Sequence, residues 1–357
     1  MSEVLDLAVK LINTPSPSRS EAAACDLIEQ RLSGAGHLEL HRIGDNLIAR
    51  TILGRRRRLV IAGHLDTVSS SEPAAMLEGG ILAGLGAADM KGTLAAMAVL
   101  AAEVTDPVND VTWVFYAREE IGRSESGLLE IATAQPELLE GDVAILGEPT
   151  SGAVEAGCQG TLRLVIRLGG VKAHTARPFM GVNAIHRSAA VMADLIAATP
   201  RRVELDGVTF VEQLQVVSVE GGVGHNVVPD QVTVVVNHRF APDRDVAAAL
   251  EWVTSLVEGH LDPDLGDSIE LADGADGAAP ALDDPVLARL VEITGGQVSA
   301  KVGWTDVATF AALGVPAANF GAGDPLLAHH PDEHVAVEQL DSVADALRSL
   351  LGDASLA

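Results

Sequence analysis

The stretch Leu59-Val60-Ile61-Ala62-Gly63-His64-Leu65-Asp66-Thr67 decides the fold, because an apolar run stops abruptly at a histidine and an aspartate. So short an apolar run predicts a buried strand of the kind found in parallel sheets. Successive side chains of a strand point to opposite faces, so His64 and Asp66 are expected on one face. The Asp66 carboxylate would then orient the imidazole or accept its second N–H. A satisfied pair of polar residues at a strand end would give the same pattern.

Four later segments also bring polar residues to the end of an apolar pattern. In chain order they carry Asp89 before the helical pattern 93–103, Glu119 and Glu120 after the strand pattern 111–117, Glu148 after 143–147, and His329 after 315–321. In open α/β sheets, ligands bind beyond the carboxyl ends of the strands, so these residues can converge from distant parts of the chain. Histidines and carboxylates together suit zinc or a similar divalent metal, and there are enough of them for two ions.

The order of strand and helix patterns predicts the fold class. Strands alternate with helices over the first part of the chain, which predicts a mixed, mainly parallel sheet flanked by helices. After residue 160 the pattern changes to that of an inserted α+β domain, with strands expected at 161–168, 213–220, 231–240 and 268–271 and helices at 183–198 and 245–258. Segment 273–280 is expected to be a linker. We therefore predict a discontinuous catalytic domain, 1–159 plus 273–357, and an inserted domain, 160–272.

The charge balance excludes some partners. The 357 residues include 50 acidic and 24 basic side chains, for a formal net charge of −26. Nucleic acids and anionic membrane surfaces favour a basic face, so we expect neither as a partner. The run Arg55 to Arg58 lies between two strand patterns and is expected to be a solvated loop.

The sequence also suggests a compartment. Cys25 and Cys158 are too few for a disulfide framework and are expected to be reduced thiols. Residues 1–13 carry acidic side chains and lack the basic-then-apolar layout of a signal peptide. No apolar run approaches the roughly 18 residues that span a bilayer. A cytoplasmic protein is therefore expected.

Five motifs carry a family resemblance. They are Gly63-His64-Leu65-Asp66-Thr67, Asp89-Met90-Lys91-Gly92, Glu119-Glu120, Gly147-Glu148-Pro149-Thr150, and the segment from Ala328-His329 to Asp332-Glu333. In order and rough spacing they resemble the M20 family of metallopeptidases and deacylases, and the resemblance covers nearly the whole chain. It implies a catalytic domain like that of the zinc exopeptidases. It also implies an inserted α+β sandwich that acts in dimerisation or as a lid.

The resemblance implies two Zn²⁺ ions per subunit, with Co²⁺ able to replace one or both. His64 and Glu148 would bind one ion, Glu120 and His329 would bind the other, and Asp89 would bridge them. A short bridging carboxylate suits paired metals, which lie roughly 3.5 to 4 Å apart. His330, next to His329, is assigned to the rim of the site or to packing.

Three further residues have implied roles in catalysis. Glu119, adjacent to a ligand, would be the general base that takes a proton from water and delivers it to the leaving amine. Asp66 would support the metal site from behind His64. His174 matches a histidine that comes from the partner subunit and stabilises the tetrahedral oxyanion, although a surface histidine on a loop would give the same pattern.

Substrate-binding residues are implied in the same way. Asn226 and Arg239 match positions that contact polar or carboxylate groups of the substrate, and Arg177 is a weaker candidate. Arginine suits this task because it binds a carboxylate through two parallel hydrogen bonds. Thr305 resembles a loop residue near the substrate amino end, but a helix-capping role would explain it equally well.

Within the family, three segments look most like the desuccinylases of actinobacterial type. They are Val154 to Arg163, Ala173-His174, and Asn183-Ala184-Ile185-His186. The resemblance implies a homodimer that hydrolyses a small anionic N-acyl amino acid, N-succinyl-LL-2,6-diaminopimelate, to succinate and LL-2,6-diaminopimelate, for the synthesis of lysine and peptidoglycan precursors. Three alternatives stay open: another N-acyl-amino-acid deacylase such as acetylornithine deacetylase, a dipeptidase, and a non-catalytic binding member of the fold.

Overall fold

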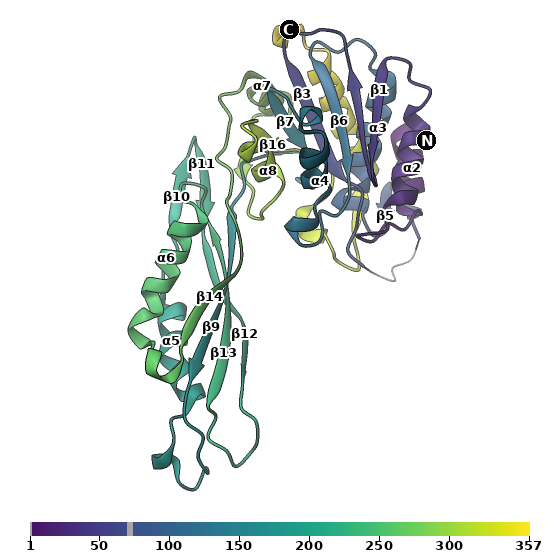
Figure 1. Cartoon of the computed structure of the whole chain (residues 1–357). Helices are drawn as coiled ribbons and strands as arrows, with labels where there is room; N and C mark the ends of the chain where they lie inside the picture. The colour runs from purple at the N-terminus through teal and green to yellow at the C-terminus, as the bar shows by residue number, and fades with distance from the viewer. Residues whose placement is uncertain (1, 70–73) are drawn as a thin grey trace. The chain divides into compact units, whose positions relative to one another are not determined.

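A computed structural model describes residues 2–69 and 74–357 and divides the chain into two compact units (Figure 1). Unit 1 comprises Met1–Ala156, Pro280–Ser299 and Thr309–Ala357, and unit 2 comprises Gly157–Ala279 and Ala300–Ala308. Segment 300–308, which contains Thr305, therefore belongs to unit 2, whereas the sequence analysis placed it in the catalytic domain. The catalytic and lid or dimerisation roles of the two parts remain predictions.

Unit 1 is built on an eight-stranded sheet. Its order is β1 (Leu38–Ile43), β2 (Asn46–Thr51), β6 (Asp110–Tyr116), β3 (Arg58–His64), β7 (Val143–Leu146), β16 (Ala317–Asn319), β8 (Val154–Ala156) and β15 (Val298–Ala300). The central strands β6, β3, β7 and β16 are parallel to one another. β1 pairs antiparallel with β2, β2 with β6, and β8 with β16. The predicted mixed, mainly parallel sheet is confirmed.

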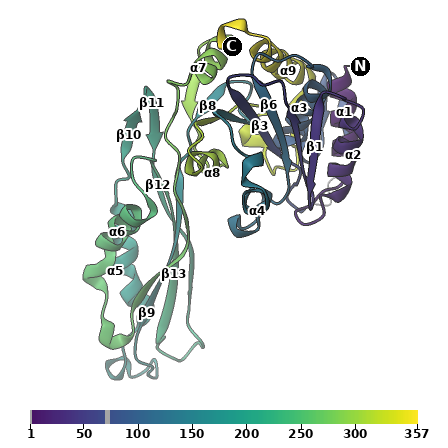
Figure 2. The ribbon, with the colours of Figure 1, turned by 45° about the horizontal axis from the view of Figure 1, so that its top comes forward.

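Helices cover this sheet. They are α1 (Glu3–Ile12), α2 (Ala22–Leu32), α3 (Gly92–Glu103), α4 (Gly127–Ala134), α7 (Pro285–Ile293) and α9 (Val337–Leu351). Helix α8 (Val307–Ala312) begins in unit 2 and ends in unit 1. Helix α3 is rich in alanine and buried on every side from Gly92 to Ala101, so α1, α2 and α9 pack closely around it (Figure 2). A short sheet of β17 (His334–Ala336), β5 (Ile81–Ala83) and β4 (Met76–Glu78) completes the described part of this unit.

Unit 2 contains a four-stranded antiparallel sheet in the order β12 (Gln213–Gly221), β13 (Gln231–Phe240), β9 (Gly160–Gly169) and β14 (Ser268–Ala275). Helices α5 (Ala184–Ala197) and α6 (Val246–Val257) pack against it, and β10 (Arg202–Leu205) pairs with β11 (Val208–Val211). Alternate residues of β9 and β13 are buried, as expected for a sheet with helices on one face.

One prediction in unit 2 is wrong. The linker was expected to begin at Asp273, but β14 continues to Ala275, because after an irregularity Asp273 pairs with Arg163 and Ala275 pairs with Thr161. The small residues of this segment show no strand pattern in the sequence, because the strand is held by pairing with β9, which is distant in the chain. Among the described residues, no helix combines the length and the hydropathy needed to cross a membrane.

Candidate metal centre

The predicted ligands lie where the central strands of unit 1 end. His64 is the last residue of β3, Glu120 follows β6, Glu148 follows β7, and His329 lies between β16 and β17. Asp89 lies in the turn Ala87–Lys91 just before α3, and the backbone angles of Asp89 and Met90 are not helical. The structure brings all of them together: within each of three sets, one atom of every residue lies within 4.8 Å of the others. The sets are His64, Asp89 and Glu148; Asp89, Glu120 and His329; and His64, Glu119 and Glu120.

Asp89 lies between the two histidines. Its Oδ1 is 3.1 Å from Nε2 of His64, and its Oδ2 is 3.6 Å from Nε2 of His329. Burial raises the pKa of Asp89, but hydrogen bonds from both histidines outweigh burial and hold this pKa well below its usual value. Each carboxylate oxygen thus faces a different imidazole, which is the arrangement that a bridge between two cations requires.

The orientation of His64 is set by the main chain. Its Nδ1 lies 2.9 Å from the carbonyl oxygen of Asp66, and 3.6 Å from the Asp66 carboxylate. The main-chain oxygen of Asp66 is thus nearer to the imidazole than its carboxylate, because β3 ends at His64 and the chain then turns its carbonyl group towards the ring. With the proton on Nδ1, Nε2 keeps its lone pair for a metal. Burial lowers the pKa of His64, but hydrogen bonds with Asp66 and Asp89 raise it well above the usual value.

The Asp66 carboxylate instead holds the Glu119–Glu120 segment. Its Oδ1 accepts the N–H of Glu119 at 3.0 Å, and its Oδ2 accepts the N–H of Glu120 at 3.1 Å. The Ser18 hydroxyl donates to the same Oδ2 at 2.7 Å. Burial raises the pKa of Asp66, but hydrogen bonds with His64, Ser18 and Glu119 together lower it. Asp66 therefore connects the segment of the proposed general base to the histidine strand.

His329 is the most exposed of the predicted ligands. Its side chain is 48% exposed, whereas that of His64 is 1% exposed. Its Nε2 lies 2.7 Å from Oε1 of Glu120, and hydrogen bonds with Asp89 and Glu120 raise its pKa to about 10. With φ at 62°, His329 adopts the left-handed backbone conformation that is uncommon for residues other than glycine.

The sequence analysis missed two buried carboxylates that support the ligand segments. Glu21 accepts the N–H of Arg118, next to Glu119, at 3.1 Å. Glu333 accepts the N–H groups of Ala88 and Asp89, both at 2.9 Å. Burial raises the pKa of both carboxyl groups. Glu333 stands inside the last family motif, which was a signal for it, whereas Glu21 before a helix resembles an ordinary helix start.

The donor set fits two divalent cations. Imidazole nitrogens and carboxylate oxygens are the ligands that zinc takes in catalytic sites. Each of two sets offers one histidine, one glutamate and an oxygen of the shared Asp89. The Nδ1 of His64 is already bound to a carbonyl oxygen, as is typical of metal-ligating histidines.

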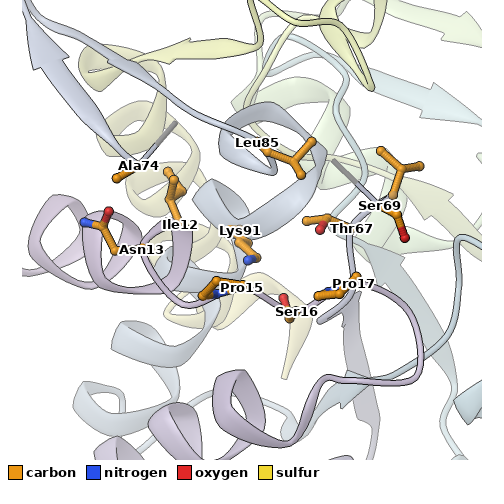
Figure 3. Close-up of a pocket in the computed structure, with 11 residues that line it drawn as sticks. Ile12, Asn13, Pro15, Ser16, Pro17, Thr67, Ser69, Ala74, Leu85 and Lys91 are labelled. Atoms are coloured by element: carbon orange, nitrogen blue, oxygen red, sulfur yellow. The ribbon is translucent and has the colours of Figure 1, made fainter. Parts of the chain in front are cut away.

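A cavity of about 300 Å³ adjoins the ends of the ligand segments (Figure 3). Thr67, which follows Asp66, and Lys91, which follows Asp89, both line it. Lys91 is 2% exposed, and its Nζ donates to the carbonyl oxygen of Thr14 at 2.9 Å. Burial lowers the pKa of Lys91 to about 8.

The predicted residues of unit 2 fall into separate places. His174, Arg177 and Asn226 lie together, since the carbonyl of His174 accepts the N–H of Arg177 and that of Asn226 accepts the N–H of Thr175. This cluster lies beyond the end of β9 at Gly169, next to the start of β13. Arg239 lies near the other end of β13, where it pairs with Thr161. Eight residues of strand between Gln231 and Arg239 correspond to roughly 26 Å.

Arg239 and Thr305 are the two predicted residues of unit 2 that lie outside the His174 cluster. Burial lowers the pKa of Arg239, and the nearby Asp273 carboxylate acts in the opposite direction. Thr305 is 3% exposed, and its carbonyl oxygen accepts the N–H of Ala308 at the start of α8 and the Sγ–H of Cys158. The roles of these residues in substrate binding remain predictions.

Known proteins resemble the chain over nearly its full length. A Mycobacterium tuberculosis (strain H37Rv) protein, provisionally named succinyl-diaminopimelate desuccinylase DapE, is 48% identical over 350 residues, which cover 98% of each chain. The succinyl-diaminopimelate desuccinylase of Corynebacterium glutamicum is 40% identical over 361 residues, covering 99% of this chain and 97% of the relative.

Solved structures share the fold. Aminopeptidase PepT from Bacillus cereus matches with a TM-score of 0.79 at 19% identity, covering 98% of this chain and 97% of that one. The Bacillus subtilis YXEP protein, a dinuclear metal-binding peptidase of the M20 family, matches with a TM-score of 0.68 at 16% identity, covering 98% and 96%. The model of peptidase family M20/M25/M40 matches residues 60–353, and the chain belongs to this family.

Proposed function

We propose that the chain is a metal-dependent succinyl-diaminopimelate desuccinylase, which hydrolyses N-succinyl-LL-2,6-diaminopimelate to succinate and LL-2,6-diaminopimelate. The observation that carries the proposal is the placing of Asp89 between His64 and His329, in a chain 40–48% identical to relatives that bear this name. The reaction would belong to the synthesis of lysine and diaminopimelate, and its proposed location is the cytoplasm.

The proposed cofactors are two Zn²⁺ ions, with Co²⁺ able to replace one or both. His64 and Glu148 would hold one ion, Glu120 and His329 the other, and Asp89 would bridge them, which agrees with two of the sets of neighbouring ligand atoms. When bound, such ions supply Lewis acidity, which lowers the pKa of water at the site towards about 7.

Glu119 is the proposed general base. Its carboxylate lies within 4.8 Å of ligand atoms of His64 and Glu120, and its main-chain N–H is held by Asp66. A carboxylate oxygen there would take the proton of the attacking water and pass it to the amide nitrogen as the C–N bond breaks. The leaving amine then departs neutral, and the new succinate carboxyl group ionises.

Binding of the substrate and dimerisation are linked in this proposal. Arg239 would bind a substrate carboxylate, with Asn226, Arg177 and Thr305 as further contacts, and His174 would stabilise the oxyanion. Within one copy of unit 2, the His174 cluster and Arg239 lie at opposite ends of β13. One small substrate cannot span that separation of roughly 26 Å. This favours a homodimer in which the two groups come from different subunits.

The test is hydrolysis by the zinc-loaded protein of N-succinyl-LL-diaminopimelate and N-acetylornithine at matched concentrations, with and without a chelator. We expect the succinyl substrate to be preferred by orders of magnitude and all turnover to stop with chelator. A preference for acetylornithine would keep the metal chemistry and reject the proposed substrate. Absence of turnover on both, with zinc bound, would reject the proposed function.

The same assay tests the base. Glu119→Gln should bind two zinc ions and lose about 100-fold or more in kcat, since general base catalysis contributes 10²- to 10⁴-fold. Glu137→Gln, which changes an exposed glutamate after α4, should keep wild-type turnover. Wild-type kcat in Glu119→Gln would remove Glu119 as the base.

A further inference from the structure

The turn that carries Asp89 is held by a residue from far along the chain. Oε1 of Glu333 accepts the main-chain N–H groups of Ala88 and Asp89, each at 2.9 Å. Glu333 is 3% exposed, so both hydrogen bonds are shielded from water. These two bonds therefore restrain the peptide planes on which the direction of the Asp89 side chain depends.

Main-chain hydrogen bonds of Glu333 tie two ligand segments together. Its carbonyl oxygen accepts the N–H of Gly84 at 3.0 Å, and its N–H donates to the carbonyl oxygen of His330 at 3.0 Å. Gly84 precedes the Asp89 turn, and His330 follows His329. Glu333 therefore links the segment of the bridging carboxylate to the segment of the exposed histidine.

Close packing fixes the position of the Asp89 turn. A Cβ atom added at Gly323 would lie 2.6 Å from Cα of Ala88, and one added at Gly92 would lie 2.6 Å from the carbonyl oxygen of Ala87. Since such contacts are too short for real side chains, the neighbouring backbone must lie directly against the turn. The turn is thus placed by packing, and its N–H groups are oriented by Glu333.

We propose that Glu333 is a positioning residue that aims the two Asp89 oxygens at two metal ions. The inference rests on the proposed bridging role of Asp89. Because Asp89 would be shared, loss of the Glu333 acceptor should weaken the binding of both ions, whereas loss of His329 should weaken only one. A residue that merely stabilised the fold would change the free energy of unfolding and leave zinc affinity unchanged.

The experiment compares Glu333→Gln with Glu333→Met, two side chains of similar length. Glutamine keeps an oxygen that accepts both N–H groups, and methionine does not. Stepwise zinc affinities are measured by competition with a chromogenic chelator, and the unfolding of the metal-free proteins by denaturant. We expect Glu333→Met to bind both ions about tenfold or more weakly, the usual effect of losing a residue that supports a ligand. Glu333→Gln should stay within about threefold of wild type.

Each other outcome has a defined meaning. Wild-type zinc affinities in Glu333→Met would overturn the inference, and so would equal weakening in both variants, since charge and not the acceptor would then be responsible. If the wild-type protein binds fewer than two ions, the proposed dinuclear centre fails first, independently of Glu333.

A second variant covers the case in which Glu333→Met does not fold. Glu333→Asp keeps the charge but withdraws the acceptor by one methylene, so it should also weaken both ions, and wild-type affinity would overturn the inference. Asp332→Asn is the matched control, because the neighbouring Asp332 side chain is 87% exposed and should leave zinc binding unchanged.

Discussion

His64 contacts the main-chain carbonyl of Asp66 at 2.9 Å, whereas the Asp66 carboxylate accepts hydrogen bonds from a different segment. One residue therefore contacts the imidazole of a proposed metal ligand with its backbone and the segment of the proposed general base with its side chain. Substitution of the side chain leaves the carbonyl in place. The two tasks can thus be separated by mutation.

Asp66→Asn should lower kcat about 10- to 100-fold while the zinc affinity of the His64 site is largely kept. The reason is that the amide replaces one acceptor oxygen by an NH₂ group, which then faces the N–H of Glu119 or Glu120. Activity and zinc stoichiometry are measured on the same preparation. If kcat stays at the wild-type value, the carboxylate does not control the position of Glu119.

The two proposed metal sites should differ in strength, because His64 is 1% exposed and His329 is 48% exposed. Electrostatic attraction is weaker where water screens it, so the ion at His329 and Glu120 should leave first when a chelator is added. His329→Ala should bind one ion with nearly wild-type affinity, and His64→Ala should lose the tighter one. Simultaneous loss of both ions in His329→Ala would contradict this order.

The proposed action of His174 across subunits can be tested with mixed dimers. His174→Ala and Glu119→Gln should each be nearly inactive alone. After mixing and exchange of subunits, half of the dimers contain one of each, and one site in each such dimer has both groups. Activity should then recover to roughly a quarter of the wild-type value, as expected for a two-fold symmetric dimer. No recovery, with mixed dimers demonstrated, would place His174 and Glu119 in the same chain.

The fold and the polar residues at the strand ends were accessible from the sequence because they depend on local patterns, whereas the assignment of metal ligands among them came from the family resemblance and stays a prediction. The apolar runs before His64, Glu119 and Glu148 mark β3, β6 and β7 directly. Supporting residues were not accessible in this way. Glu333 contacts Asp89 across 244 positions in the sequence, and its partner is a main-chain N–H, which every residue except proline has. No side-chain pattern marks such a partner.

His238 is a buried histidine of unit 2 that the proposed reaction does not use. Its protonation should lower the stability of unit 2 in acid. The residue is fully buried, its Nδ1 donates to the carbonyl of Gln213 at 2.8 Å, and its Nε2 lies 2.7 Å from a nitrogen of Arg244. Protonation of Nε2 would place an N–H and a positive charge against the guanidinium group of Arg244. Burial lowers the pKa of His238, and the charges of Arg244 and Arg201 act in the same direction against the attraction of Glu212.

The sign of the pH effect follows from this shift. With the folded pKa below the ordinary 6.5, the unfolded chain binds more protons between the two values, so stability falls as pH drops from 6.5 through the folded pKa. We expect the free energy of unfolding to decrease over this window. In His238→Gln, which keeps a donor and an acceptor without titrating, the decrease should be smaller, whereas His186→Gln, at an exposed histidine of α5, should retain it. The free energy of unfolding of the wild type and the two variants is measured with denaturant between pH 5 and pH 8. An equal pH dependence in the three proteins would show that protonation of His238 does not destabilise unit 2.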